Sequence, residues 1–405
     1  MSLKYAASID DLRLIAKRRI PRFAFDLVDG GAEDESNLRR NREAFDAVRL
    51  TPRYMVDVSA PSIEVELFGR TYAAPFGVAP MGLLNVFWPD ADLHLARLAA
   101  KQKIPYVASG VASTRLEDLA ENADGMAWFQ LYTSSDWDLT NRLLGRAENA
   151  GYEVLIVTVD VPTAAKRDRD IRNRLQIPFR LKPKIALDLL LNPRWSVETL
   201  IGGRPTIANY VDHDRSSNSL AALQTKLISS SFDWGQLKRI RDRWSGRLLV
   251  KGIMHADDAL GCFEAGCDGI VVSNHGGRQL ASGAASLEAL PAIANMVGGK
   301  MSILLDSGIR RGTDIVRAKA FGADFALLGR SFAYGVGAGG AAGAKHAYHT
   351  IEVELLRALG QLGRPEFSTV DPSLLANGNW VAGSNSAQFP YSHLAAGPHS
   401  ERGLL

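Results

Sequence analysis

Short apolar segments that alternate with amphipathic ones constrain the fold of this chain more than any other feature of its sequence. From Pro75 onward, each apolar run precedes a segment whose apolar residues recur every three or four positions, the spacing of one helix face. Eight such strands with crossover helices favour a closed parallel barrel of roughly 250 residues over an open doubly wound sheet. We therefore predict an α/β fold of the (β/α)8 TIM barrel type. The expected strands are 76–79, 106–109, 128–132, 154–160, 248–251, 269–273, 302–306 and 325–329.

Accessory segments surround the predicted barrel. Apolar spacing predicts N-terminal helices over 9–19 and 23–29, and the charged run 32–42 is interpreted as a solvated surface helix or turn. The chain should form one domain, 1–405, with its barrel core at about 75–362. The crossover helices are expected at 92–102, 115–122, 138–150, 256–265, 287–297 and 313–321.

Two stretches break the alternation. The insertion 178–227, after the fourth strand, is too long for an ordinary barrel loop and mixes Lys and Arg residues with the leucine run 189–191 and Trp195. It could be an amphipathic membrane contact, although a mobile lid or an oligomer contact is commoner in soluble enzymes. The tail 363–405 is rich in Gly, Pro, Ser and Asn and shows no periodicity, so we expect it to be partly disordered or to wrap a neighbouring subunit.

Charge and cysteine content exclude several classes of partner. The 47 Lys and Arg residues nearly balance the 44 Asp and Glu residues, and a net charge of +3 does not indicate a nucleic-acid partner. Cys262 and Cys267 have the spacing of neither a zinc site nor a redox pair, so we predict no metal and two buried thiols in a reducing compartment. Without a signal-like start or a run of about 18 apolar residues, the expected location is cytoplasmic. Membrane association through the insertion is the alternative.

Polar or special residues stand at nearly all of the predicted strand ends. In a barrel these ends converge on one face, where active sites are built. Ordinary strand-terminating polarity would explain one or two of them, whereas a shared pocket explains the whole set. The residues are Pro80, Ser109, Gln130, Tyr132, Thr158, Asp160, Lys251, Ser273, His275, Asp306, Gly329 and Arg330.

The end of the sixth strand combines a base with a cation. His275 can take a proton near neutral pH, and Arg278 can hold a carboxylate bidentately, while Gly276 and Gly277 let a ligand approach the backbone. The competing interpretation is a hydrogen-bonded structural histidine. The combination points to a site for a small organic acid.

The loops after the seventh and eighth strands favour phosphate binding. Residues 305–312 and 328–331 supply glycine amides together with Arg310 and Arg330, at the strand ends where barrels commonly bind phosphate. The alternative is that both arginines are surface charges. The GxGxxG pattern at 335–340 is not a dinucleotide site, because it does not directly follow a strand and no acidic residue ends a next strand. We interpret it as a flexible loop before a helix.

Four motifs together resemble those of the FMN-dependent L-2-hydroxy acid oxidases and dehydrogenases, a family that includes glycolate oxidase, L-lactate dehydrogenase and mandelate dehydrogenase. They are SNHGGRQL at 273–280, LDSGIRRG at 305–312, FQLY at 129–132 and VKG at 250–252. The resemblance runs from about residue 9 to about residue 362. It implies an FMN cofactor, a 2-hydroxy acid substrate, an electron acceptor and a homotetramer.

The resemblance also implies roles for individual residues. His275 would be the catalytic base, Asp160 the carboxylate that stabilises its imidazolium, and Lys251 the cation beside the flavin. The substrate would be bound by Arg278, Arg167 and Tyr132. The cofactor site would comprise Ala79, Pro80, Met81, Ser109, Gln130, Thr158, Lys251, Ser273, Asp306, Gly308, Arg310, Gly329 and Arg330.

Two positions bear on substrate and acceptor. Leu27 stands where the family usually has a tyrosine that binds the substrate carboxylate, so we expect weaker carboxylate binding or a larger, more apolar substrate, and a non-standard substrate is an alternative. Gly82 stands where oxidases of the family tend to carry alanine and dehydrogenases glycine. We therefore expect transfer of electrons to a quinone or cytochrome, with oxygen use as an oxidase as the alternative. A non-catalytic FMN-binding barrel is a further alternative, and both hydride transfer and a carbanion route are open.

Overall fold

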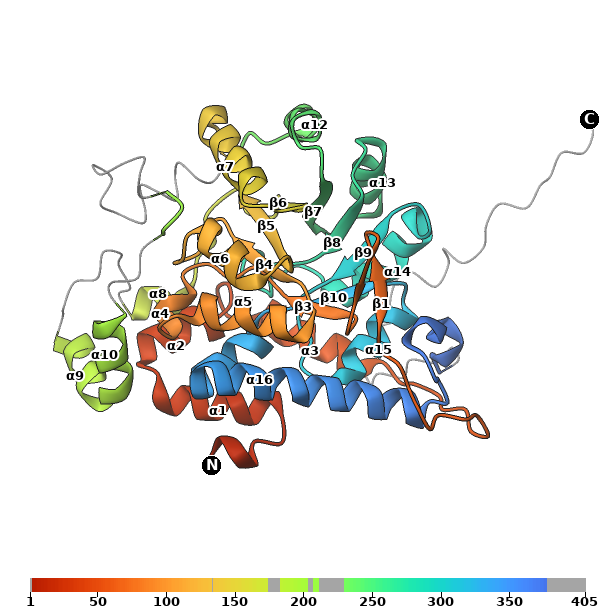
Figure 1. The fold of residues 1–405 in the computed structure, drawn as a ribbon, viewed down its shortest axis with the longest axis horizontal. Helices are drawn as coiled ribbons and strands as arrows, with labels where there is room; N and C mark the ends of the chain where they lie inside the picture. Colours follow the sequence, from red (N-terminus) through yellow and green to blue (C-terminus); the bar gives the residue numbers. More distant parts are fainter. Residues whose placement is uncertain (1, 133, 174–182, 203–206, 211–228, 377–405) are drawn as a thin grey trace, which may run out of the picture.

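A closed barrel of eight parallel strands forms the centre of the molecule, in the order β10-β3-β4-β5-β6-β7-β8-β9 (Figure 1). This computed structural model describes residues 2–132, 134–173, 183–202, 207–210 and 229–376. The predicted TIM barrel is confirmed. The strands are β3 (Phe76–Val78), β4 (Tyr106–Ser109), β5 (Ala127–Tyr132), β6 (Val154–Thr158), β7 (Arg247–Ile253), β8 (Gly269–Val272), β9 (Ser302–Leu305) and β10 (Phe325–Leu328).

The barrel interior is a packed core. Strand residues that face inward, among them Trp128, Leu249 and Phe325, form a separate apolar cluster. The hairpin of β1 (Val65–Leu67) and β2 (Arg70–Tyr72) lies against the same cluster, where the Trp128 indole N–H donates to the Tyr72 hydroxyl at 3.3 Å. Because the hairpin packs on this end of the core, we expect the site at the opposite end, where the strands have their carboxyl termini.

Helices surround the barrel as predicted, although several strands end one or two residues earlier than the pattern suggested. The polar residues at the predicted ends, such as Asp160 and Asp306, lie just beyond the strand ends. The helices after successive strands are α4 (Leu84–Phe87), α5 (Ala91–Gln102), α6 (Leu116–Ala123), α7 (Trp137–Asn149), α13 (Ala256–Glu264), α14 (Ser286–Val297), α15 (Gly312–Ala320) and α16 (Arg330–Gln361).

The interpretation of 335–340 as a flexible loop is wrong, because these residues lie inside α16. The helix is interrupted only at Gly339 and Gly340, which have non-helical backbone angles. The glycines serve close packing: a Cβ on Gly337 would lie 2.5 Å from Phe87 and 2.6 Å from Ile20. A larger side chain would separate α16 from its neighbours, including α1 (Ile9–Arg19), which runs beside it (Figure 1).

The charged run 32–42 is not the solvated segment that its composition suggested. After α2 (Arg22–Asp29), helix α3 (Ser36–Ala47) buries one face against the barrel. Asn37 and Asn41, one helical turn apart, are 1% and 2% exposed. These two side chains contact the loop after β8, so the N-terminal helices contribute to the site face of the barrel.

Only part of the predicted insertion 178–227 falls within the described residues. Between β6 and β7 the chain forms α8 (Asp168–Arg172), α9 (Pro183–Leu191), α10 (Pro193–Ile201) and α12 (Trp234–Arg243). Within the described ranges, no helix is both long enough and apolar enough to cross a membrane. Cys262 and Cys267 are buried and free, as predicted.

The start of the tail packs on its own chain. Short 3-10 turns at Phe367–Thr369 and Pro372–Leu374 lie beside the segment before β1, and the Thr51 N–H donates to the Leu374 carbonyl at 2.8 Å. Residues 377–405, for which disorder or contact with a neighbouring subunit was expected, lie outside the described part of the chain. The homotetramer stays a prediction.

Candidate active site

A cavity of about 460 Å³ lies at the carboxyl ends of the barrel strands. Most residues predicted for the site line it. Ser109, Ser273 and Asp160 do not, but each is hydrogen-bonded to a residue that does. The predicted residues in its wall are Ala79, Pro80, Met81, Gln130, Tyr132, Thr158, Arg167, Lys251, His275, Arg278, Asp306, Gly308, Arg310, Gly329 and Arg330.

The loop after β8 holds His275 in a sparsely populated backbone conformation. His275, Gly276 and Gly277 have φ values of 57°, 67° and 71°, so the chain makes a left-handed turn over three residues. Gly277 has no space for a side chain, because a Cβ there would lie 2.7 Å from the backbone nitrogen of Leu38. Such a turn persists only where the surroundings hold it.

A network of three asparagines holds this turn. The Asn274 amide has its Nδ2 at 2.7 Å from the side-chain oxygens of both Asn37 and Asn41 and at 2.9 Å from the Ala284 carbonyl, so its two N–H groups are shared among three acceptors. Its own oxygen accepts from Asn41 at 2.9 Å and from the Gly277 N–H at 3.0 Å. Every hydrogen-bonding atom of the Asn274 amide has a partner, so α3 fixes the backbone that carries His275.

His275 pairs with Asp160 at the mouth of β6. The two are 2.8 Å apart, from Nδ1 to Oδ1, and Nε2 has no hydrogen-bond partner among the described residues. Burial lowers the pKa of His275 below its ordinary value, and the Asp160 carboxylate offsets part of that effect. The imidazole is therefore neutral at neutral pH, with Nδ1–H directed to the carboxylate and Nε2 available to accept a proton.

Lys251 is a buried cation between two carboxylates. Its Nζ lies 3.2 Å from Asp306 Oδ2 and 3.9 Å from Asp160 Oδ2, and it donates to Ser273 Oγ at 2.8 Å. Burial opposes its charge, but Asp306 and Asp160 outweigh burial and raise the pKa of Lys251 above its ordinary value. A fixed positive charge consequently lies at the floor of the cavity.

Polar side chains at the ends of β4, β5 and β6 form a chain of hydrogen bonds. The Ser109 hydroxyl donates to Gln130 Oε1 at 3.0 Å, and Gln130 Nε2 donates to Thr158 Oγ1 at 2.9 Å. The Gly110 N–H also donates to Gln130 Oε1, at 3.3 Å. The amide orientation of Gln130 is thereby set, so this wall offers a defined pattern of donors and acceptors.

The arginines of the cavity lack anionic partners. In the described part of the chain none of them forms an ion pair with an acidic side chain, and Arg167 Nε is buried without a hydrogen-bond partner. Burial and the neighbouring Arg167 lower the pKa of Arg278 well below its ordinary value. Partly buried cations without an ion-pair partner favour an anionic ligand. The four residues are Arg167, Arg278, Arg310 and Arg330.

Arg330, for which a phosphate-binding role was predicted, also makes hydrogen bonds within the protein. Its three nitrogens donate to the carbonyls of Val28, Gly276 and Gly30, at 2.8, 2.8 and 2.7 Å. The backbone N–H groups that begin α16 lie at the same end of β10. Arg310 lies over the Tyr334 ring at 5.5 Å, and one of its nitrogens bonds to the Ile309 carbonyl.

Several residues of the site were missed by sequence reasoning. Asp170 lines the cavity, and burial raises the pKa of its carboxyl group. Its charged surroundings in the sequence resemble those of a solvated helix, so no local signal marks it. Asn37 and Asn41 did carry a signal, because residues four apart share a helix face. Part of the cavity wall is apolar, and of this part only Leu27 was predicted from the sequence to bear on the substrate. Other apolar residues of the wall are Leu83, Val111, Val161, Ala164 and Ile171.

The chain is similar to several known proteins over nearly its whole length. (S)-mandelate dehydrogenase of Pseudomonas putida is 39% identical over 371 residues, which cover 91% of this chain and 94% of the relative. L-lactate dehydrogenase of Pseudomonas syringae pv. syringae is 36% identical over 373 residues, which cover 91% of this chain and 98% of the relative. A crystal structure of the monotopic membrane protein (S)-mandelate dehydrogenase superposes with a TM-score of 0.89 at 38% identity, covering 92% of this chain and all of that one (100%).

The family model described as FMN-dependent dehydrogenase matches residues 16–377. This range contains the barrel and the cavity. The match accounts for a site that combines a base, a buried lysine and arginines without anionic partners. The protein is thus an oxidoreductase that acts on CH–OH groups and oxidises an L-2-hydroxy acid such as mandelate or lactate. The chain belongs to the FMN-dependent dehydrogenases, and its cofactor is FMN.

Proposed function

We propose that the protein oxidises an L-2-hydroxy acid with a large apolar side chain to the 2-oxo acid and passes the electrons to a quinone- or cytochrome-type acceptor. One observation carries this proposal: His275, which is paired with Asp160, and the arginines Arg167 and Arg278 line the same cavity. A base beside two carboxylate anchors is the arrangement that oxidation of a 2-hydroxy acid requires.

The cavity suits FMN in its donor chemistry. Arg310 and the N-terminus of α16 would hold the phosphate, because both lack an anionic partner among the described residues. Gln130, Thr158 and Lys251 would contact the polar edge of the ring system. When bound, FMN accepts the two electrons and one hydrogen that leave the substrate.

The protein side chains would orient the substrate and take its proton. Arg278 and Arg167 hold the carboxylate, and Tyr132, whose pKa is raised by burial, stays protonated and donates a hydrogen bond. His275 Nε2 accepts the proton, and Asp160 stabilises the imidazolium that results. The bound carboxylate limits how the substrate can turn, so the reacting carbon is aimed at the cofactor.

The apolar wall described above supports a substrate larger than glycolate or lactate. We expect (S)-mandelate to reduce the enzyme-bound flavin with a specificity constant at least about tenfold above that of L-lactate, because burial of additional apolar carbons favours the larger acid. The measurement is anaerobic stopped-flow bleaching of the flavin with mandelate, lactate, glycolate and matched alcohols that lack a carboxylate. Replacing Leu27 with Tyr should raise the specificity constant for lactate and so narrow its difference from that for mandelate. Equal or faster reduction by glycolate would refute the apolar preference, and bound flavin that no acid reduces would favour a non-catalytic barrel.

If the reduced flavin is then reoxidised, the same experiment distinguishes a dehydrogenase from an oxidase. Faster reoxidation by a quinone analogue than by oxygen is expected. Gly82 supports this expectation, because a Cβ at this position would lie 2.4 Å from Val111 Cγ2, so the wall is built around glycine. Faster reoxidation by oxygen would instead identify an enzyme that produces hydrogen peroxide.

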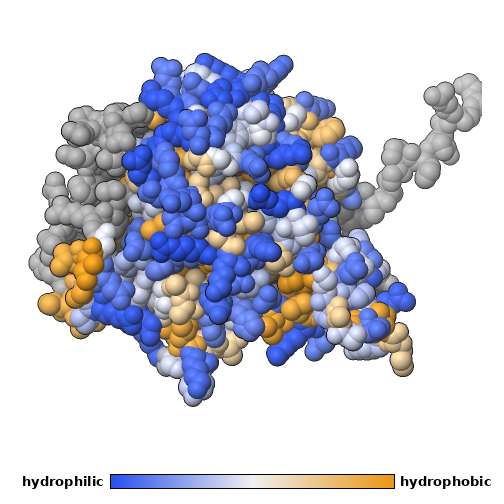
Figure 2. Space-filling model, viewed as in Figure 1, coloured by the Kyte–Doolittle hydropathy of each residue, from blue (hydrophilic) through white to orange (hydrophobic). Residues whose placement is uncertain are grey.

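An exposed apolar surface on α9 and α10 supports attachment to a membrane surface. Leu190, Leu200 and Ile201 are 77%, 83% and 81% exposed, and Figure 2 shows an orange patch at the left of the molecule, where Figure 1 places these helices. Trp195 anchors α10 from its other side, with its indole N–H donating to the Phe87 carbonyl at 3.0 Å. The similar mandelate dehydrogenase is described as a monotopic membrane protein.

We expect the holoenzyme to sediment with phospholipid vesicles and the double variant Leu190→Glu/Leu200→Glu to stay in the supernatant. Two charges in the apolar face oppose its burial at the acyl boundary. Flavin reduction should be unchanged in the variant, because neither residue lines the cavity. Sedimentation of the variant to the same extent as the wild type would assign the membrane contact to another surface or exclude it.

A further inference from the structure

We propose that Arg169 is a positioning residue that fixes the loop 161–173, and with it the substrate-binding Arg167, against the N-terminal segment 26–35. The loop follows β6 and brings Arg167 and Asp170 to the cavity. The inference rests on the proposed function, because the placement of Arg167 affects substrate only if a carboxylate binds there.

Apolar packing does not hold this loop. Helix α8 contains no buried residue, and three of the five residues at 161–165 are exposed. A helix of five residues is also too short to be stable alone. The position of the loop must therefore come from polar contacts with the rest of the protein.

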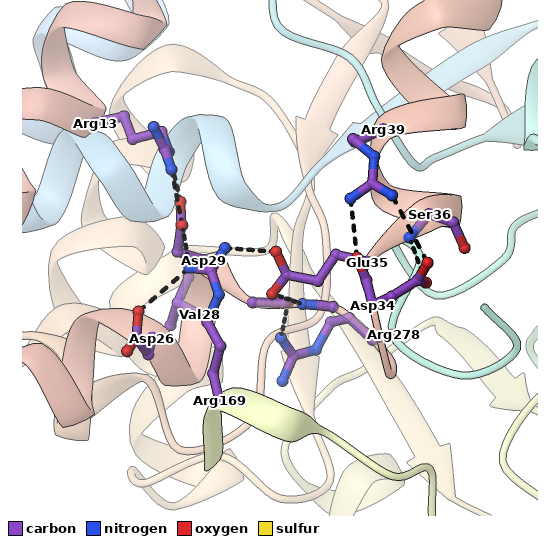
Figure 3. Close-up of polar contacts among 12 residues, drawn as sticks. Arg13, Asp26, Val28, Asp29, Asp34, Glu35, Ser36, Arg39, Arg169 and Arg278 are labelled. Carbon is purple, nitrogen blue, oxygen red and sulfur yellow. Dashed lines mark hydrogen bonds and ion pairs between the residues drawn. The ribbon is translucent and has the colours of Figure 1, made fainter. Parts of the chain in front are cut away.

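Arg169 makes the densest of these contacts. Its Nη1 donates to Asp29 Oδ2 at 2.8 Å and to Asp26 Oδ1 at 3.2 Å, and its Nη2 donates to Glu35 (Figure 3). We call Asp26, Asp29 and Glu35 the carboxylate cluster. Their side chains are 10%, 3% and 17% exposed and that of Arg169 is 29% exposed, so the ion pairs are partly shielded from water.

The remaining contacts of the loop end in the same segment. The Glu33 N–H donates to the Lys166 carbonyl at 2.9 Å, and Asn173 Nδ2 donates to Asp26 Oδ2 at 2.8 Å. Among the described residues, every hydrogen bond from 161–173 to another part of the chain ends within 26–35. Within the described part of the chain, one cation and two single hydrogen bonds thus hold the loop in place.

Segment 26–35 also holds the opposite wall of the site. The Gly30 carbonyl accepts from Arg278 Nη1 and Arg330 Nη2, both at 2.7 Å, and the Ala32 N–H donates to the Gly277 carbonyl at 2.9 Å. The segment is therefore fixed relative to Arg278, and Arg169 connects the other carboxylate anchor to it. The spacing of Arg167 and Arg278 depends on Arg169.

Arg13 offers a matched control. It binds the same Asp29 from α1, with Nη2 at 2.8 Å from Oδ2, but it does not contact the loop (Figure 3). Burial alone would raise the pKa of Asp29, but hydrogen bonds from Arg13 and Tyr334 outweigh it and lower that pKa. Loss of Arg13 and loss of Arg169 both remove a cation from the cluster, and only the second releases the loop.

The test compares Arg169→Met, Arg169→Lys and Arg13→Met as FMN-loaded enzymes. For Arg169→Met we expect the Kd of the 2-hydroxy acid and of oxalate, an unreactive dianion read by flavin absorbance, to rise roughly ten- to a hundredfold, the scale of losing one hydrogen bond to a charged group. The saturating rate of flavin reduction should change much less. Arg169→Lys should recover part of the affinity, and Arg13→Met should leave both constants near those of the wild type.

Amide hydrogen exchange supplies a readout that does not depend on substrate. Exchange in peptides covering 161–173 should accelerate in Arg169→Met and stay unchanged in Arg13→Met. Equal Kd increases in the two variants, an unchanged Kd in Arg169→Met, or unchanged exchange in the loop would each overturn the proposal. Failure of every 2-hydroxy acid to reduce the wild-type flavin would instead refute the proposed function, and hydrogen exchange would still show whether Arg169 holds the loop.

Discussion

Replacing His275 with asparagine is expected to slow flavin reduction by a 2-hydroxy acid by about 10²- to 10⁴-fold, the contribution typical of a general base, while FMN stays bound. The loss is equivalent to about 3 to 5 kcal/mol of transition-state stabilisation. The reason is chemical: an amide cannot accept the proton that the imidazole Nε2 takes. Single-turnover reduction under anaerobic conditions measures the effect directly, without a contribution from the acceptor.

Asparagine is the informative substitution because it leaves the loop intact. The φ of 57° at this position is one that asparagine tolerates better than most residues. His255→Asn is the matched control, since His255 caps α13 at the surface and asparagine is a good N-cap. Retention of more than roughly a tenth of the wild-type rate in His275→Asn would show that another group is the base.

The pH dependence should report the same histidine. Because burial lowers the pKa of His275, the imidazole stays neutral and active at neutral pH, and activity should fall only as the solution becomes more acidic than pH 6.5. Asp160 raises this pKa, so Asp160→Asn should move the acidic limb of kcat/KM to still lower pH. Asp160→Asn should also reduce the value of kcat/KM on its pH-independent plateau, since the imidazolium loses its counter-ion. A shift of the limb to higher pH would contradict the assigned pair.

The barrel could be predicted because each strand is buried on both faces and reads as a short apolar run that ends in a polar residue. His275, Lys251 and Arg278 were found for the same reason, as they directly follow such runs. The prediction of a loop at 335–340 was wrong because glycines, taken from the sequence alone, indicate flexibility. In the folded protein a Cβ on Gly343 would lie 1.9 Å from the Gly335 carbonyl oxygen, so these glycines permit contact between two helical turns that the sequence does not reveal.

The remainder of the site depends on contacts between distant segments. Arg169 lies among alternating charges that are typical of a solvated helix, and its partners Asp29 and Glu35 are 140 and 134 positions away. Asn274 is farther still in sequence from its partner Asn37, 237 positions away. Which charges and amides pair is decided when the N-terminal helices dock on the barrel. Local periodicity therefore identifies the groups that react but not those that hold them in place.

Replacing Arg278 with methionine is expected to lower kcat/KM for a 2-hydroxy acid by about 10²- to 10³-fold, equivalent to about 3 to 4 kcal/mol, the cost of truncating one partner of a buried charge pair. With Leu27 in place of a hydroxyl donor, Arg167 would be the remaining cation that binds the carboxylate, beside the Tyr132 hydroxyl. FMN should stay bound, because Arg310 and the N-terminus of α16 are unaffected. Arg172→Met is the control: Arg172 lies on the loop 161–173, its side chain is 70% exposed, and it pairs only with Asp168 among the described acidic residues.

The stability of Arg278→Met should show whether Arg278 serves substrate recognition or the stability of the fold. Burial and neighbouring arginines lower the pKa of Arg278, which means that the folded, substrate-free protein holds this charge at a cost. Methionine removes that cost and fills a similar volume, and the Gly30 carbonyl keeps its hydrogen bond from Arg330. We therefore expect the free energy of unfolding to be unchanged or higher while substrate affinity falls. A variant that unfolds more easily, or that keeps kcat/KM within roughly tenfold of the wild type, would show that Arg278 serves the fold and that Arg167 carries carboxylate recognition.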